Sequence, residues 1–349
     1  MNYKNDISRR DFVKITGLTL GAGALLGKES MAAEKIPAAT KSLTAVGIAR
    51  GETVGSAVRK AVELSGGLNF IKSGQTVLIK PNVNSGDAYP ASTNPEVIYE
   101  VIKMVWERDP KRVIVGERSN YLRTTRDEMK KAGIDKAIFD GKAELVTFDD
   151  MSWRFVNPTK SVNWDTGYHV AEMLYQVDHI INVPVIKTHN TGWFTMSMKN
   201  LVGIIPGKDR IYMHSKVPAN LRDNVKEQTQ QNYNYPAFAK MIAEIGLAVT
   251  PSLNILDGTK AFVKGGPREG DSVEPKLIVA SRDRIAADVT GLGVLKHYGT
   301  TDRIQKVSVW QQLIIARAVE IGLGVSNLSQ IDLKSANIPE IESIRTQMI

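Results

Sequence analysis

The chain has 349 residues, of which 42% are hydrophobic and 23% are charged, and this composition excludes a fibrous or largely disordered protein. The formal net charge is +8, but no run of lysine and arginine with interleaved aromatic residues occurs, so we expect no nucleic acid partner. The lack of cysteine excludes disulfides, a cysteine-ligated iron–sulfur cluster and a cysteine nucleophile, and leaves any other cofactor unknown.

Residues 1–33 have the pattern of an export signal. Arg9 and Arg10 precede an apolar stretch at residues 15–27, and small residues follow it. The apolar stretch is shorter than the about 20 residues that cross a bilayer. The segment SRRDFVK resembles a twin-arginine signal, with Val13 where leucine is usual. We therefore predict export to the periplasm by the twin-arginine translocation machinery, and no transmembrane span in the mature chain.

The end of this signal peptide is compatible with two outcomes. Cleavage would fall after Ala32 or Ala33, where small residues lie. Lys28 and Glu29 make the exit region less typical of a cleavage site, so retention of the segment as an uncleaved anchor also agrees with the pattern.

Strand and helix patterns alternate along residues 34–349. Apolar residues at helical spacing predict helices, and short apolar runs between them predict strands. Asn94 caps one helix with Pro95 at its first position, and Gly66 and Gly67 end the helix before it. The predicted helices cover residues 54–65, 94–109, 124–132, 238–249, 284–299 and 308–322. The predicted strands cover residues 43–50, 75–80, 112–117, 143–150, 177–187, 253–258, 275–281 and 331–335.

This alternation predicts an α/β fold over residues 34–349, with a mainly parallel, doubly wound sheet and helices on both of its faces, in a single domain. The nearly unbroken apolar run at 177–187 is typical of a parallel strand buried on both sides, although Pro184 lacks the N–H that a sheet ladder needs. Residues 207–235 are polar, lack clear periodicity and exceed the usual loop length, a pattern typical of a lid or of a disordered segment, and we predict a lid there.

Charged side chains follow five of the predicted strands at their carboxyl ends. Ligands of open α/β sheets bind beyond this edge, so we expect these side chains to meet at one cleft. Each of them alone can be explained without a function, as a solvated lysine, an aspartate in a turn or a histidine that makes a structural hydrogen bond. Only the whole set favours a functional site. The residues are Lys80 with Pro81 and Asn82, Glu117, Asp149 and Asp150, Lys187 with Thr188 and His189, and Asp257 with Gly258.

The lysines of this set predict a site for a small anion. Lys80, Lys187 and Lys199 would surround a carboxylate or phosphate, and Asn82 and Asn200 would contribute hydrogen bonds. The segment FTMSMKN can begin a helix whose N-terminal amides favour an anion. The alternative is that the methionines of this segment pack in the core and Lys199 faces water.

Three residues are candidates for catalysis. His189, together with Glu117 or Asp257, would move protons. The same side chains and His214 have the donor types of a metal site, but no HxH or HExxH spacing supports one, so the metal content stays unknown. Residues 207–210, GKDR, and His214 would close over the site as part of the lid.

Several motifs resemble a family known as domain of unknown function 362, whose activity is uncharacterised. They are VLIKPN, PVIKTH, MKNLVGIIPGKDR, LDG and VASRDRIAADVTGLGVL, and the resemblance covers roughly residues 43–298. Some relatives carry cysteine clusters similar to ferredoxin sites, and this chain has none. The resemblance implies the site residues Lys80, Pro81, Asn82, Lys187, His189, Lys199, Asn200, Gly203, Asp257 and Asp288, of which Asp288 comes from the resemblance alone.

From these observations we expect an exported protein of this uncharacterised family. Its expected activity is that of an enzyme that acts on a small carboxylate or phosphate through a cleft of lysine, histidine and acidic residues. The alternatives are a periplasmic ligand-binding or metal-binding protein, and an accessory factor for an exported complex.

Overall fold

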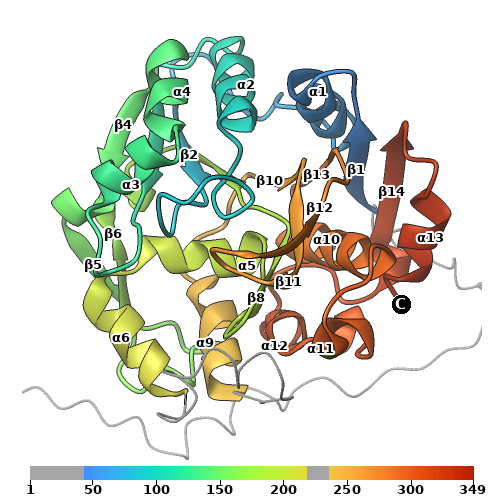
Figure 1. Cartoon of the computed structure of the whole chain (residues 1–349). Coiled ribbons are helices and arrows are strands. Elements are labelled where there is room, and N and C mark those ends of the chain that lie inside the picture. The colour runs from blue at the N-terminus through green and yellow to red at the C-terminus, as the bar shows by residue number, and fades with distance from the viewer. Residues whose placement is uncertain (1–42, 218–235) are drawn as a thin grey trace, which may run out of the picture. The chain divides into compact units, whose positions relative to one another are not determined.

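The computed structural model describes residues 43–217 and 236–349, which fold around an eight-stranded sheet (Figure 1). The predicted signal at residues 1–33 and residues 218–235 of the predicted lid lie outside the described residues. The strand order from edge to edge is β14-β1-β13-β10-β7-β2-β3-β4. These strands are β1 (Thr44–Arg50), β2 (Thr76–Pro81), β3 (Arg112–Glu117), β4 (Glu144–Thr147), β7 (His179–Val183), β10 (Leu253–Gly258), β13 (Leu277–Ser281) and β14 (Ile331–Ala336).

Neighbouring strands of this sheet are parallel except at β13, which runs antiparallel to both β1 and β10. The predicted α/β fold with a mainly parallel sheet is therefore confirmed. The direction of β13 was not predictable from its apolar run, since a buried strand looks the same in both directions. The connection from β10 contains the hairpin of β11 (Ala261–Gly265) and β12 (Gly270–Val273) in place of a crossover helix, so the chain returns antiparallel.

Helices cover both faces of the sheet, as expected for a doubly wound fold (Figure 1). Successive residues of β2 face opposite sides, so Val77 and Ile79 pack in one buried cluster and Leu78 in the other. Lys80 follows Leu78 onto the face that carries α5. One face is covered by α1 (Val54–Leu64), α2 (Pro95–Trp106), α3 (Thr125–Lys131) and α4 (Ile134–Asp140). The other is covered by α5 (Ser197–Asn200), α9 (Pro236–Ile245), α10 (Arg284–His297) and α12 (Leu313–Ile321).

The predicted helix boundaries near the site are confirmed. The Asn94 side chain accepts a hydrogen bond from the backbone N–H of Glu96 at 3.0 Å, which caps α2. Gly66 and Gly67 have φ values of 106° and 71°, a backbone region that favours glycine. The helix α1 ends before them for this reason. The short helix α4 was missed: Gly133, with φ 74°, separates α3 from α4, and this glycine interrupted the apolar pattern. The helices that were also not predicted are α6 (Gly207–Ser215), α11 (Asp302–Gln305) and α13 (Ile341–Thr346).

The apolar run at 177–187 is not one strand, contrary to the prediction. β7 ends at Val183, because Pro184 cannot donate to the ladder. The chain then forms a separate antiparallel hairpin from β8 (Lys187–His189) and β9 (Trp193–Thr195). Lys187 and His189 therefore belong to this hairpin and not to the end of a strand of the main sheet.

The first part of the predicted lid is the helix α6 (Gly207–Ser215), in which Arg210 and Met213 are buried. The smaller elements are the paired strands β5 (Trp153–Val156) and β6 (Tyr168–Ala171), and the helices α11 (Asp302–Gln305) and α13 (Ile341–Thr346). Across residues 43–217 and 236–349, none of the helices has the length and apolar character of a membrane span.

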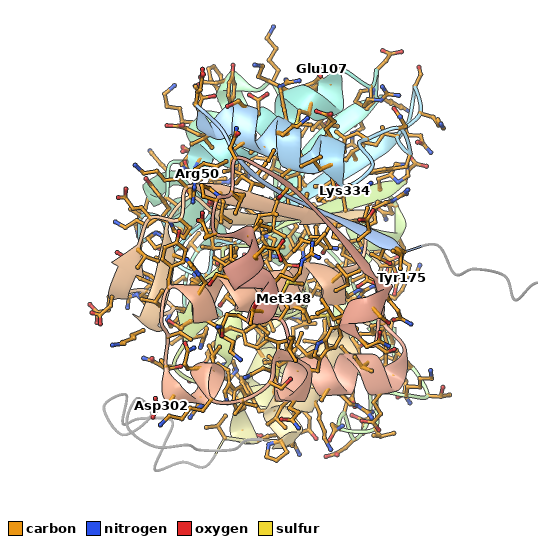
Figure 2. All side chains as sticks on the ribbon, turned by 90° about the vertical axis from the view of Figure 1, so that its right-hand side faces the viewer. Arg50, Glu107, Tyr175, Asp302, Lys334 and Met348 are labelled. Carbon is orange, nitrogen blue, oxygen red and sulfur yellow. The ribbon has the colours of Figure 1, made fainter. Side chains whose placement is uncertain are left out.

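Charged side chains lie mainly at the outside of the molecule, and some of the buried ones form ion pairs. Glu107 and Lys334, for example, have side chains that are 54% and 47% exposed and lie at the surface (Figure 2). By contrast Glu244 and Arg317 are 0% and 6% exposed and form an ion pair of 2.6 Å between α9 and α12. Close to the carboxyl edge of β2 and β3, by contrast, the buried Lys187 and Arg210 donate to backbone carbonyls and have no carboxylate partner among the described residues.

Candidate functional site

A buried ion pair joins the carboxyl ends of two neighbouring parallel strands. Lys80 is the second-to-last residue of β2 and Glu117 is the last residue of β3, and both side chains are almost completely buried. The Lys80 Nζ lies 2.8 Å from Glu117 Oε1 and 2.9 Å from Oε2. The backbone N–H groups of Val83 and Arg118 also donate to the Glu117 carboxylate, at 3.1 and 2.8 Å. Glu117 is therefore a fully engaged acceptor at the base of the site.

The protonation of this pair is set by two opposing effects. Burial lowers the pKa of Lys80 and raises the pKa of Glu117, because a charge is costly away from water. The attraction between the two groups, together with the backbone hydrogen bonds to Glu117, favours the charged form of each. With its charges matched, the pair adds no net charge to its surroundings.

Gly203 allows the chain to rest directly on this pair. A Cβ atom at residue 203 would lie 2.2 Å from Glu117 Oε1 and 2.5 Å from Lys80 Nζ. Neither atom can move away without breaking the buried ion pair, so the close approach requires glycine. The short 3-10 turn Leu201–Ile204 is thereby seated on the ends of β2 and β3.

The N-terminal amides of α5 bind a carboxyl group of the protein itself, that of Asp288, and not the ligand anion that the sequence led us to expect. The Asp288 carboxylate accepts hydrogen bonds from the backbone N–H groups of Ser197 and Met198, at 2.7 and 3.0 Å. Burial raises the pKa of Asp288 to about 7, while the two amides favour its charged form. These amides are consequently engaged, and Asp288 positions the helix that carries Lys199 and Asn200.

A chain of buried asparagines connects α5 to three strands of the sheet. Asn82 Nδ2 donates to Asn200 Oδ1 at 3.1 Å, and Asn200 Nδ2 donates to Asn182 Oδ1 at 2.8 Å. Asn182 Nδ2 in turn donates to Asn254 Oδ1 at 3.1 Å. Sequence reasoning missed Asn182 and Asn254. Their signal was a polar residue inside a buried strand, which requires a hydrogen-bonding partner.

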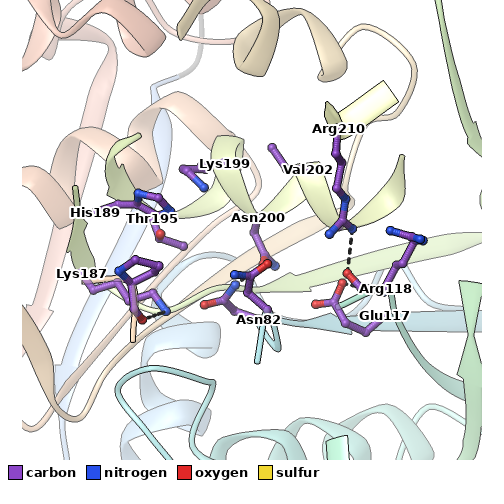
Figure 3. A pocket seen from close by; sticks show the side chains of 13 residues that line it. Asn82, Glu117, Arg118, Lys187, His189, Thr195, Lys199, Asn200, Val202 and Arg210 are labelled. Carbon is purple, nitrogen blue, oxygen red and sulfur yellow. Dashed lines mark hydrogen bonds between the residues drawn. The ribbon is translucent and has the colours of Figure 1, made fainter. Parts of the chain in front are cut away.

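A cavity of ≈ 40 Å³ lies beside these elements (Figure 3). This volume is enough for a few water molecules or a small anion, and smaller than the pockets of about 300 Å³ or more that hold drug-sized ligands. Its lining combines predicted site residues with residues from α6 and β9. The lining residues are Asn82, Asn84, Glu117, Arg118, Lys187, His189, Thr195, Lys199, Asn200, Val202, Gly203, Arg210 and Pro267.

Lys187 is a buried cation held by backbone carbonyls. Its Nζ donates to the carbonyl oxygens of Ala91 and of Pro267, the latter at 3.2 Å, and the residue is only 1% exposed. Burial, with repulsion from Lys199, lowers its pKa to about 7. Figure 3 shows Lys187 beside His189 among the side chains that line the cavity.

Lys199 is half-buried, and its ammonium group makes no hydrogen bond or ion pair with any residue that the structure describes. Burial and the nearby charge of Arg210 lower its pKa to about 7. Its side-chain stem packs on Gly192 in the β8–β9 hairpin, where a Cβ atom would lie 2.2 Å from Lys199 Cε. The aliphatic part of the side chain thus positions the amine, and the amine itself has no partner among the described residues.

His189 faces the same cavity from β8. Its Nδ1 accepts a hydrogen bond from the backbone N–H of Gly192 at 3.0 Å, so the neutral ring carries its proton on Nε2. Burial, followed by repulsion from Lys199 and Lys187, lowers the pKa of His189 well below 6.5. The ring is therefore neutral at physiological pH and offers an N–H donor.

Two arginines line the cavity beyond the predicted set of site residues. Arg210 of α6 donates to the carbonyl oxygens of Ser119 and Arg118, both at 2.7 Å, and burial lowers its pKa to about 10. Arg118 has its Nε 2.9 Å from Asp149 Oδ1 without hydrogen-bond alignment, and its buried Nη1 has no hydrogen-bond partner in the described parts of the chain. Arg118 could have been predicted as a site residue from the sequence, because it directly follows a predicted strand.

Asp257 is near these residues in the fold but does not line the cavity. Its carboxylate accepts hydrogen bonds from the backbone N–H of Asn94 at 2.8 Å and from the N–H and hydroxyl of Thr259 at 3.0 and 2.6 Å. It holds the loop before α2 in place. Lys80 likewise does not line the cavity, and its ammonium group is bonded to Glu117.

The other predicted side chains are dispersed around the site. Asp150 accepts from the Thr147 hydroxyl, and His214 lies on α6 with its Nδ1 2.7 Å from the carbonyl oxygen of Arg210. Within the described residues, no group of three or more His, Cys, Asp or Glu side chains is placed to hold a metal ion.

Comparisons with known proteins place the cavity within a shared family domain. A family model described as "Domain of unknown function (DUF362)" matches residues 77–293, a range that contains every residue lining the cavity. The thylakoid-associated protein sll1697 of Synechocystis sp. is 27% identical over 290 residues, which cover 82% of this chain and 83% of the relative.

Two solved structures resemble the chain at low identity. The lactate racemase apoprotein of Thermoanaerobacterium thermosaccharolyticum aligns with a TM-score of 0.43 and 13% identity, over 70% of this chain and 55% of that one. A Thermotoga maritima protein aligns with a TM-score of 0.37 and 13% identity, over 67% of this chain and 57% of that one. The chain thus spans little more than half the length of each of these two.

Replacing Asp288 tests its role in seating α5. Asp288→Ala should lower the free energy of unfolding by about 1–2 kcal/mol, because two buried backbone N–H groups lose their acceptor. Asp288→Asn keeps one carbonyl acceptor and should lose less. Urea unfolding followed by circular dichroism measures both. An alanine variant as stable as the unchanged protein would contradict the assignment.

Proposed function

The chain belongs to the family described as Domain of unknown function (DUF362), and we propose that it is an enzyme acting on a small anionic substrate, a carboxylate or a phosphate. The observation that carries the proposal is a small cavity lined by Lys187 and Lys199, two lysines with pKa values of about 7 and without carboxylate partners among the described residues.

The charge balance of the cavity favours an anion. Glu117 is neutralised by Lys80, while Lys187 and Arg210 donate only to backbone carbonyls. Carbonyl oxygens satisfy donors but do not cancel a positive charge. A carboxylate or phosphate placed in the cavity would do both, and charge-assisted hydrogen bonds of this kind are about twice as strong as neutral ones.

The pKa values favour an enzyme over a simple binding protein. A site that only holds an anion gains from fully protonated lysines with pKa values near 10. Lowering these pKa values to about 7 weakens anion binding at neutral pH, but it makes the lysines able to give and take protons at that pH.

The geometry supports different roles for the lining residues. Two of the three N–H groups of Lys187 are aimed at carbonyls, which leaves one for the anion. His189 would donate from Nε2 to an oxygen of the substrate, and Lys199, with no partner in the described chain, would carry the proton. Glu117 would act as the counter-charge of Lys80, and Asp257 as a support of the loop before α2.

Anion binding should weaken as pH rises above 7. The lysines must be protonated to bind an anion, and their pKa values of about 7 mean that binding takes up protons above this pH. Sulfate, whose charge is constant in this range, should bind with full affinity at about pH 6 and lose up to about tenfold per pH unit for each titrating lysine. Isothermal titration calorimetry measures this. Constant affinity up to about pH 9 would show that the lysines titrate normally.

Proton transfer can be tested without knowing the product. In D₂O the protein should exchange a carbon-bound hydrogen of a bound small acid, and nuclear magnetic resonance of a panel of carboxylates and phosphate esters would detect it. Lys199→Met should abolish this exchange, while Lys306→Met, at an exposed lysine directly after α11, should leave it unchanged. Tight binding of anions without exchange by the unchanged protein would favour the alternative, a binding protein.

We further propose that residues 1–33 direct export through the twin-arginine pathway, on the strength of Arg9-Arg10 and the short apolar stretch that follows. Conservative replacement of both arginines by lysine should stop export, because this pathway reads the arginine pair. Cell fractionation of a bacterial host would then find the variant in the cytoplasm and the unchanged protein in the periplasm. Equal distribution of the two would contradict the proposal.

A further inference from the structure

Lys199 has the features of an amine nucleophile and not only those of an anion-binding cation. It lines the cavity, its end has no partner among the described residues, and the ions that surround it are Lys187 and Arg210. A lysine beside other cations is activated, because the neutral amine is favoured over the ammonium. Its reactive electron pair is then available to a bound substrate.

The β8–β9 hairpin positions this amine relative to a proton donor. Gly192 packs against the Lys199 stem, where any Cβ atom would clash with Cε, and the N–H of the same glycine orients His189. One turn of the chain therefore holds the amine of Lys199 and directs the Nε2–H of His189. Such a shared support is what a reaction between an amine and a polarised substrate group requires.

The remaining lining groups would hold the acid end of the substrate. Lys187 keeps one N–H free at one end of the cavity, and the buried Nη1 of Arg118 has no hydrogen-bond partner within the described chain. An acid group bound by such donors leaves the rest of a small molecule beside Lys199. The cavity of ≈ 40 Å³ restricts that remainder to a few atoms.

We propose that Lys199 forms a Schiff base with the carbonyl group of a small oxo acid or of a carbonyl-bearing phosphate ester. This rests on the anionic substrate proposed above and adds a carbonyl group to it. The neutral amine of Lys199 adds to the carbonyl carbon, and the oxygen takes a proton from His189 Nε2, which solvent replaces. The oxygen takes a second proton from the amine nitrogen and leaves as water, which gives a protonated imine on Lys199, with no oxidant or reductant consumed.

The imine would make the proposed proton transfer easier. A protonated C=N bond withdraws electrons from the neighbouring carbon, so a hydrogen on that carbon becomes more acidic. In this sequence of steps Lys199 is the covalent catalyst, and the proton transfer that the proposed function assigns to its amine passes to His189 or bound water.

Borohydride trapping tests the proposal on the full chain. The protein is incubated with pyruvate and sodium cyanoborohydride, digested and mapped by mass spectrometry. The expected result is one reduced adduct on Lys199, formed at least about tenfold faster than with acetone, which has the carbonyl but no acid group to bind. Glycolaldehyde phosphate in place of pyruvate shows whether a phosphate is preferred to a carboxylate.

Two variants serve as matched controls. Lys199→Arg retains the positive charge but lacks the amine, so the adduct should disappear, whereas Lys306→Arg, at an exposed lysine, should label as the unchanged protein does. Circular dichroism confirms that each variant is folded. Labelling spread evenly over exposed lysines, or none on Lys199, would overturn the Schiff base.

Anion binding is measured separately, so that the two proposals can fail independently. If sulfate and pyruvate stabilise the protein against thermal unfolding but no adduct forms on Lys199, the anion site stands and the covalent step is wrong. If neither anion binds, the proposed function is wrong, and the Schiff base proposal, which depends on it, is wrong as well.

Discussion

The buried ion pair between Lys80 and Glu117 is the interaction on which the rest of the site depends. A buried ion pair is stable only when its charges are matched and its remaining hydrogen-bonding groups are satisfied. Glu117 therefore also binds the N–H groups of Val83 and Arg118, which fixes the chain after both strands. Gly203 then packs against the pair and seats the turn that follows α5. Three segments far apart in sequence are aligned by one carboxylate.

The same pair determines the electrostatic character of the cavity. Because Glu117 is matched by Lys80, it does not neutralise Lys187, Lys199 or Arg210. The buried carboxyl group of Asp288 does not neutralise them either, because it binds the N-terminal amides of α5. What remains is a small space with excess positive charge, in which lysines lose protons more easily than in water. The proposed anion binding and the proposed amine reactivity both follow from this excess of positive charge.

Much of the fold was predictable because its signals are local. Helical spacing, the Asn94 cap and the Gly66-Gly67 stop all act within a few residues, and the structure confirms them. The direction of β13 and the break at Pro184 were not predictable with the same certainty, since they depend on which strands pair. Lys80 and Asp257 show how far the site could be predicted from the sequence. Both lie at the ends of buried strands, but Lys80 pairs with Glu117 whereas Asp257 binds the loop at Asn94, which is distant in sequence.

The sequence by itself determined the α/β class, the family, the polar strand ends and Lys187, His189, Lys199 and Asn200 as members of a common site. Only the tertiary structure decided which of these groups remain available to a ligand. The reason is that each buried charge takes its nearest partner in space, and spatial neighbours such as Asp288 and Ser197 or Asn82 and Asn200 lie about a hundred residues apart along the chain. The sequence shows which reactive side chains are present. Their packing decides which of them hold the structure together and which remain available to a ligand.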